Sequence, residues 1–181
     1  MKSILRTIQI LFWNFFNIQI FNKYKNPPRN LIISPGGVAT TMLINYLSKY
    51  IQVNDPNDKD LLKHLTKLPS NLNKHTKILY IYGDTKSIFL SLKRRNYFYS
   101  HCLKMNCLKC LFFQGGLQYK FFEDRINYQK NLLTKNQNYQ LLVLSYDEIW
   151  TKKNKIKKFF KISSKEFIDR FPQKKSRVTK E

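Results

Sequence analysis

The chain has 181 residues, of which 43% are hydrophobic and 15% aromatic. This apolar content suits one domain with a real core and excludes a chain that is disordered over most of its length. The formal charge of +22, from 33 Lys and Arg against 11 Asp and Glu, favours a polyanionic partner: nucleic acid, an anionic membrane, or a phosphorylated or sulfated small molecule. Asn, Ile, Tyr and Phe are also abundant, so AT-rich coding is an alternative source of the lysine excess.

The first segment, "ILRTIQILFWNFFNIQIF" (4–21), is rich in large apolar residues but is interrupted by polar ones such as Arg6, Asn14 and Asn17. A membrane-spanning helix needs about 20 mostly apolar residues. No small-residue cleavage site follows, which disfavours a signal peptide. We therefore predict an amphipathic helix over residues 1–25 that packs on the domain, with a membrane-surface helix or a signal anchor as alternatives.

Strand and helix patterns then alternate along the chain. Short apolar runs bounded by turn residues predict buried strands over 31–33, 77–82 and 139–146. Helical spacing of apolar residues predicts helices from Thr40 to Tyr50, over 59–67, over 87–95, and in "KKNKIKKFFKI" and "SKEFIDRF"; residues 96–138 give no clear pattern. This alternation predicts an α/β domain over 26–171, a three-layer sandwich around a mainly parallel sheet, followed by a basic tail over 172–181.

The loop after the first strand, "SPGGVATT" (34–41), has the composition of an anion site. Gly36 and Gly37 allow close approach to backbone N–H groups, Val38 and Ala39 complete the loop, and Thr40 and Thr41 can cap the following helix and donate hydroxyls to a phosphate or sulfate. The alternative is an ordinary strand-to-helix turn. The Walker pattern is absent, so an ATPase or a nucleotide kinase is not supported.

Two further segments, "KILYIYGDTKSIFLSLKRRN" and "LLVLSYDEIW", complete a pattern with this loop. Together the three segments resemble the sulfotransferase family that uses 3′-phosphoadenosine 5′-phosphosulfate (PAPS), over about residues 30–171. The resemblance implies a P-loop NTPase-like fold in which "SPGGVATTM" holds the phosphosulfate and Ser91 contacts the 3′-phosphate. It further implies transfer of a sulfuryl group from PAPS to a hydroxyl of a carbohydrate or small metabolite.

The family also uses a general base between the loop and the second strand, and "NDKDLLKHL" offers His64 as that base and Lys63 as a cation. The sequence departs from the family at two cations, because Gly36 or Gly37 stands at the loop lysine and Gly83 at the 3′-phosphate arginine. Either other cations hold the nucleotide, or the protein is an inactive descendant that binds a nucleotide or another anion. Lys86, Lys93, Arg94 and Arg95, and the tail residues Lys174, Lys175 and Arg177, are the nearby substitutes.

Three cysteines, Cys102, Cys107 and Cys110, lie close together in the sequence. Their odd number and crowding do not suggest a disulfide framework, so we expect free thiols, no metal, and a cytoplasmic protein with membrane association as an alternative. A zinc site with His101 as fourth ligand is conceivable from the spacing. The remaining alternative function is a basic protein held on anionic membrane or nucleic acid, although no motif for specific nucleic-acid recognition is present.

Overall fold

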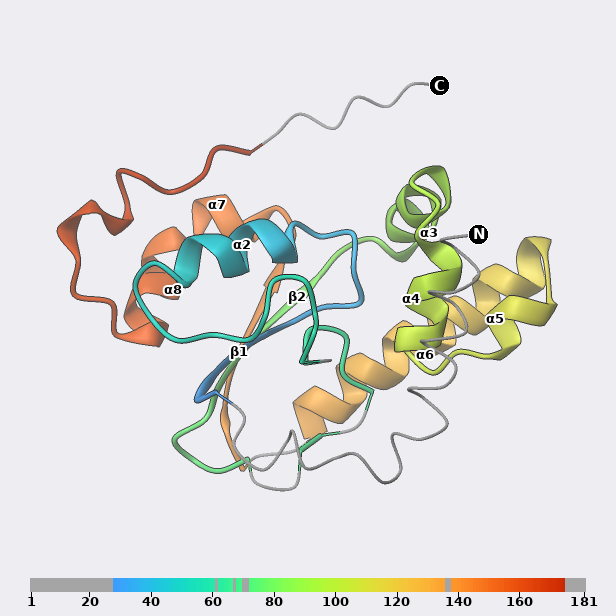
Figure 1. The fold of residues 1–181 in the computed structure, drawn as a ribbon, viewed down its shortest axis with the longest axis horizontal. Helices are drawn as coiled ribbons and strands as arrows, with labels where there is room; N and C mark the ends of the chain where they lie inside the picture. The colour runs from blue at the N-terminus through green and yellow to red at the C-terminus, as the bar shows by residue number, and fades with distance from the viewer. Residues whose placement is uncertain (1–27, 61, 67, 70–71, 136–137, 175–181) are drawn as a thin grey trace.

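The structure is a computed structural model that describes residues 28–60, 62–66, 68–69, 72–135 and 138–174. The helix predicted over 1–25 and the tail beyond residue 174 lie outside the described residues. Within the described part the chain forms an α/β domain with helices on both faces of a parallel sheet (Figure 1). The α/β class expected from the sequence is therefore confirmed.

The sheet contains the strands β1 (Asn30–Ile33), β2 (Lys77–Tyr82) and β3 (Gln140–Ser145), in the order β1-β2-β3 and all parallel. Ile33 lies opposite Tyr80, and Tyr80 lies opposite Val143. All three predicted strands are confirmed to within one residue at each end. The carboxyl ends of the strands consequently meet at one edge, which is where ligands bind in open parallel sheets.

One face of the sheet is covered by α2 (Thr40–Leu47), α7 (Glu148–Thr151) and α8 (Lys153–Phe160), which lie together in Figure 1. Their apolar residues form one core with the alternate strand residues Ile32, Leu79 and Leu142. The 3₁₀ turn η2 (Lys165–Phe167) adds the fully buried Phe167. The helix predicted for "SKEFIDRF" is only this short turn, and Phe171 beyond it enters the same core.

The opposite face is covered by the C-terminal half of α6 (Gly115–Lys135) and by the segment before β2. Leu133 of α6 and Leu62 pack against Leu31 and Tyr80 of the strands. Burial of these apolar side chains on both faces explains why each strand reads as a nearly continuous apolar run in the sequence.

The helices α3 (Thr85–Arg94), α4 (Phe98–Lys104) and α5 (Lys109–Phe112) lie with α6 beyond the sheet. Phe89, Phe98 and Phe122 interlock with ring centroids 4.9–5.8 Å apart. The three cysteines are free and buried in the same region. The hydrogen bond with Cys102 and burial raise the pKa of the Cys110 thiol to about 12, and the hydrogen bond with Cys110 and burial also raise the pKa of Cys107.

The helix predicted over 59–67 is wrong, since the described residues of this segment form turns. Aspartate side chains bind the backbone instead: Asp60 accepts from the N–H of Asp55 at 2.5 Å, and Asp58 accepts from the N–H of Lys63 at 3.0 Å. Aspartate competes in this way with helical hydrogen bonding. Among the described residues no helix combines the length and apolar character needed to cross a membrane.

Candidate functional site

The loop between β1 and α2 is held in an unusual backbone conformation. Gly36, Gly37 and Ala39 all have positive φ, at 103°, 68° and 58°. Ala39 is the N-cap of α2 and makes no side-chain cap, so the expectation that Thr40 or Thr41 caps the helix is wrong. A left-handed non-glycine residue costs about 1–2 kcal/mol. The loop therefore keeps this shape only because surrounding contacts impose it.

Those contacts begin with two buried hydroxyls. Ser34 Oγ and Thr40 Oγ1 lie 2.6 Å apart, and the N–H of Gly36 donates to Ser34 Oγ at 3.2 Å. The backbone N–H of Ser34 donates to the carbonyl of Lys63 at 3.0 Å. Thr40 was predicted to donate to a bound anion, but its hydroxyl is hydrogen-bonded to Ser34 inside the protein. Ser34 is a supporting residue that the sequence did not single out.

Lys63, the predicted cation, reaches the first turn of α2. Its Nζ donates to Thr41 Oγ1 at 3.0 Å and to the carbonyl of Pro56 at 2.7 Å. Burial lowers the pKa of this ammonium group, while the nearby Asp58 opposes that effect. Asp58 is itself buried and pairs with Lys104 Nζ at 2.7 Å. The structure therefore brings Lys63 into contact with Thr41, although the two residues are far apart in the sequence.

His64, the predicted base, is buried beside the loop. Its Nδ1 donates to the carbonyl of Ser34 at 2.8 Å, and because a carbonyl can only accept, the other nitrogen, Nε2, carries a lone pair. Burial lowers the pKa of His64 to about 3, against a smaller opposing effect of the Ser34 hydrogen bond. The imidazole is consequently neutral near pH 7 and is a weak base.

A second imidazole, from His101 on α4, packs against His64 with ring centroids 4.5 Å apart. Its Nδ1 donates to the carbonyl of Tyr97 at 3.2 Å, which leaves its Nε2 as an acceptor too. A Cβ built on Gly36 would lie 2.5 Å from His101 Nε2. Only glycine fits at that position, and burial lowers the pKa of His101 well below its usual value.

The sequence offered His101 only as a zinc ligand with the cysteines, and gave no signal that it would meet the loop. In the structure Cys102 is fully buried in the core on the same helix. Over the described ranges no group of three or more His, Cys, Asp or Glu residues is arranged to hold a metal ion.

A second cation reaches the loop at Gly37. The Nη2 of Arg95 lies 3.6 Å from the position that a Cβ of Gly37 would occupy. The Nε of the same guanidinium donates to the carbonyl of Ser91 at 3.1 Å. Ser91, predicted to contact a 3′-phosphate, lies on α3 one turn before Arg95. Lys63 and Arg95 therefore supply positive charge next to a loop that has no lysine of its own.

A cavity of about 550 Å³ opens beside this loop at the carboxyl ends of β2 and β3. Asp84 caps α3 by accepting from the N–H of Ser87 at 2.7 Å, and the hydrogen bonds from Ser87 lower the pKa of its carboxyl. Lys174 Nζ lies 2.7 Å from Asp147 Oδ1. The residues around the cavity are Val38, Tyr82, Gly83, Asp84, Ser87, Ile88, Ser145, Tyr146, Asp147 and Lys174.

Of the predicted cofactor residues, only Val38 lines this cavity; Lys174, in the basic tail predicted over 172–181, lines it as well. Gly83, at the position of the family's arginine, has little room for a side chain, since its Cβ would lie 2.9 Å from Val38 Cγ1. An arginine at this point would require Val38 to move. Lys63 and Arg95 instead supply cations at the loop.

Comparison of the chain with models of protein families, with curated proteins and with solved structures finds no match.

Proposed function

We propose that this protein binds PAPS and transfers its sulfuryl group to a hydroxyl of a carbohydrate or small-molecule acceptor. The observation that carries the proposal is the placing of two cations, Lys63 at Thr41 and Arg95 at Gly37, against the glycine loop that follows β1. Backbone N–H groups at a helix N-terminus attract anions. Cations beside them supply the charge that the missing loop lysine supplies in the family that this sequence resembles.

In the proposed reaction the acceptor oxygen attacks sulfur, the bond between sulfur and the bridging phosphate oxygen breaks, and adenosine 3′,5′-bisphosphate leaves. Catalysis of such a transfer is mostly positioning and stabilisation of charge. Lys63 stabilises the charge that develops on the leaving phosphate. The acceptor proton goes to His64 Nε2, whose proton affinity rises when an anion lies beside it.

A second candidate function is a sulfotransferase-like protein that binds a nucleotide or another anion without catalysis. It is favoured by the low pKa of His64, about 3, which makes a weak base, and by the lack of room for an arginine at Gly83. The two candidates share one binding site and differ in turnover and in the range of anions that they bind.

A thermal-shift comparison of adenosine 3′,5′-bisphosphate, AMP and sulfate tests the binding step. A ligand at 100 times its Kd stabilises the folded state by about 2.7 kcal/mol, so the bisphosphate should raise the Tm more than the other two. Lys63→Met should reduce this gain, whereas the matched control Lys59→Met, at an exposed position, should not. Equal shifts with bisphosphate and AMP would contradict the first candidate, and no shift with any of the three ligands would contradict both.

A turnover assay separates the catalytic candidate from the non-catalytic one. With PAPS and a panel of hydroxylated acceptors, the active protein should release adenosine 3′,5′-bisphosphate, and His64→Gln should lower kcat while the bisphosphate still binds. Binding without release of product by the wild-type protein would favour the non-catalytic candidate.

A further inference from the structure

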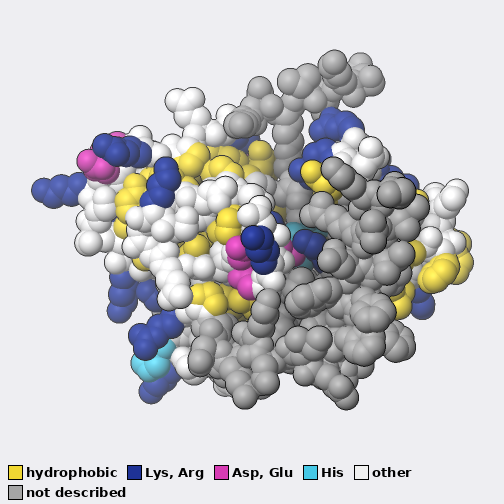
Figure 2. All heavy atoms as spheres, in the orientation of Figure 1, with side chains coloured by type: hydrophobic (Ala, Val, Ile, Leu, Met, Phe, Trp, Pro, Cys, Tyr) yellow, Lys and Arg dark blue, Asp and Glu magenta, His cyan; other side chains and the backbone are white. Residues whose placement is uncertain are grey.

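Four large apolar side chains project into solvent where α5 leads into α6. Leu108, Phe112, Phe113 and Leu117 are 47%, 80%, 42% and 55% exposed; we refer to them as the apolar tip. This segment lies at the end of the molecule farthest from α8 (Figure 1), and Figure 2 shows hydrophobic side chains gathered on that edge. Apolar residues that lie so close together on a surface mark an interaction site.

The apolar tip stands on an ordered scaffold. Gln118 Nε2 donates to the carbonyl of the buried Cys110 at 2.8 Å, which fixes the start of α6 to α5. The rings of Phe113 and Phe121 lie 5.1 Å apart. Gly115 and Gly116 have open space where a side chain would be. The turn therefore projects away from the domain while its base is held by packing.

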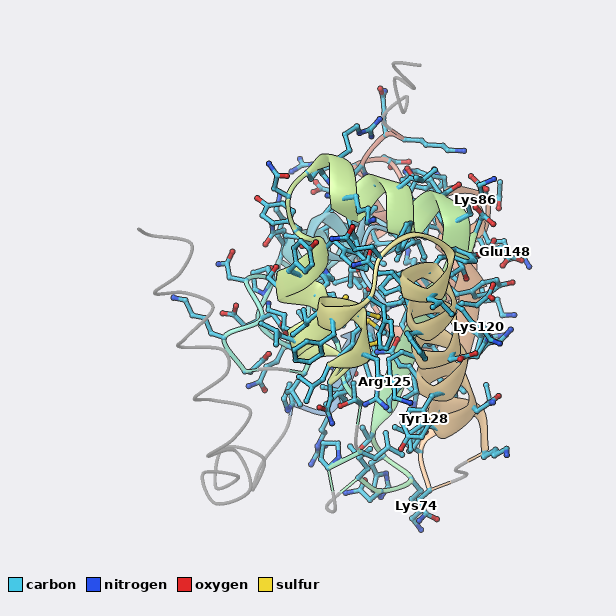
Figure 3. All side chains as sticks on the ribbon, turned by 90° about the vertical axis from the view of Figure 1, so that its right-hand side faces the viewer. Lys74, Lys86, Lys120, Arg125, Tyr128 and Glu148 are labelled. Carbon is cyan, nitrogen blue, oxygen red and sulfur yellow. The ribbon has the colours of Figure 1, made fainter. Side chains whose placement is uncertain are left out.

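The stretch of chain that carries the apolar tip has an excess of basic residues. Residues 85–122, which comprise α3, α4, α5 and the first turns of α6, contain seven Lys and Arg and no Asp or Glu, although Asp84, Glu123 and Asp124 border this stretch. Lys109 belongs to α5, and Figure 3 shows Lys120 on α6. The seven are Lys86, Lys93, Arg94, Arg95, Lys104, Lys109 and Lys120.

We propose that the apolar tip inserts into the headgroup region of an anionic lipid bilayer, with the exposed Lys109 and Lys120 on the same helices contacting the lipid phosphates. Apolar side chains beside lysines on a protruding element are the combination that binds such an interface. A second copy of the chain fits less well, because two tips face to face would bring the two sets of cations together. Nucleic acid would use the charge but has no place for aliphatic Leu108 and Leu117.

The test is flotation of the full chain with vesicles of phosphatidylcholine alone or with about 30% phosphatidylserine, compared with vesicle-free protein. The protein should float with the anionic vesicles, less so as salt is raised, because screening weakens the attraction of exposed charges. Replacing Phe112 and Phe113 by Ser should reduce the partition coefficient at least about tenfold, by loss of apolar burial.

Tyr128→Ser is the matched control. Tyr128 is 49% exposed and lies on the same helix, about 16 Å along the axis from Leu117 at 1.5 Å per residue (Figure 3). This variant should bind vesicles as the wild type does. If the double variant does not fold, Phe112→Ser alone serves, because this ring is 80% exposed.

Three results would overturn the proposal. The first is that the wild type does not float with anionic vesicles. The second is that the double variant floats as well as the wild type, which would assign binding to another segment such as residues 1–25 or to charge alone. The third is a dimer in size-exclusion chromatography that the double variant abolishes, with no vesicle binding.

Discussion

Gly36→Ala tests the contact between the loop and His101 most directly. The new Cβ would lie 2.5 Å from His101 Nε2, at a residue with φ of 103°. Backbone strain costs about 1–2 kcal/mol and overpacking about 1–3 kcal/mol. We therefore expect the free energy of unfolding to fall by about 2–5 kcal/mol, measured by urea unfolding with linear extrapolation.

Gly115→Ala is the matched control, because Gly115 also has a positive φ, 60°, but has no atom within 4 Å of the new Cβ. It should cost only the strain, about 1–2 kcal/mol. His101→Ala should recover the overpacking part, so that the double variant Gly36→Ala/His101→Ala shows a coupling of about 1–3 kcal/mol. Equal costs of Gly36→Ala with and without His101, or equal costs at Gly36 and Gly115, would refute the reasoning.

Two other predictions concern titration and charge. Because the pKa of His64 is about 3 in the folded protein and about 6.5 unfolded, the unfolded state binds more protons between these values. The stability that His64 contributes is full above pH 6.5 and should fall by about 2 kcal/mol by pH 5, and His101, whose pKa is also lowered, adds a loss of the same sign. In urea unfolding above pH 6.5 and at pH 5, His64→Gln should reduce the total loss by about 2 kcal/mol. His75→Gln, at an exposed position, should not reduce it, and an unchanged loss in His64→Gln would contradict the account. Asp58→Asn removes the charge that pairs with Lys104 at a buried site and should cost about 1–3 kcal/mol by chemical denaturation. Glu166→Gln, in an exposed pair, should cost under about 0.5 kcal/mol, and equal costs at the two positions would count against a structural role of the Asp58 network.

The strands could be predicted because burial on both faces leaves an uninterrupted apolar run, as in "KILYIY". The helix expected over 59–67 failed because Asp58 and Asp60 satisfy backbone N–H groups locally, a competition that periodicity does not register. The helices of residues 96–138 were missed because several of their large apolar residues, such as Phe112, are exposed and obscure the period.

The sequence singled out the glycine loop and the pair Lys63-His64, because glycines at strand ends and this pair stand out, and in the structure the two segments are in contact. The contacts of His101 with Gly36 and of Arg95 with Gly37 were not predicted. Both are tertiary contacts from helices more than 50 residues away, and no local pattern encodes them. The support of the loop by Ser34 was missed for the same reason, because its partners become neighbours only after folding.

The buried thiols of Cys102, Cys107 and Cys110 allow local opening of the structure around them to be measured by alkylation. Alkylation requires the thiolate and access to it, and both are suppressed for Cys107 and Cys110 by burial and raised pKa values in the closed state. A maleimide or iodoacetamide label should therefore enter only when α4 and α5 part from α6. When closing is faster than labelling, the labelling rate gives the free energy of that opening. Labelling rates measured with and without lipid or nucleotide would then show which of these ligands raises the free energy of opening in this part of the molecule.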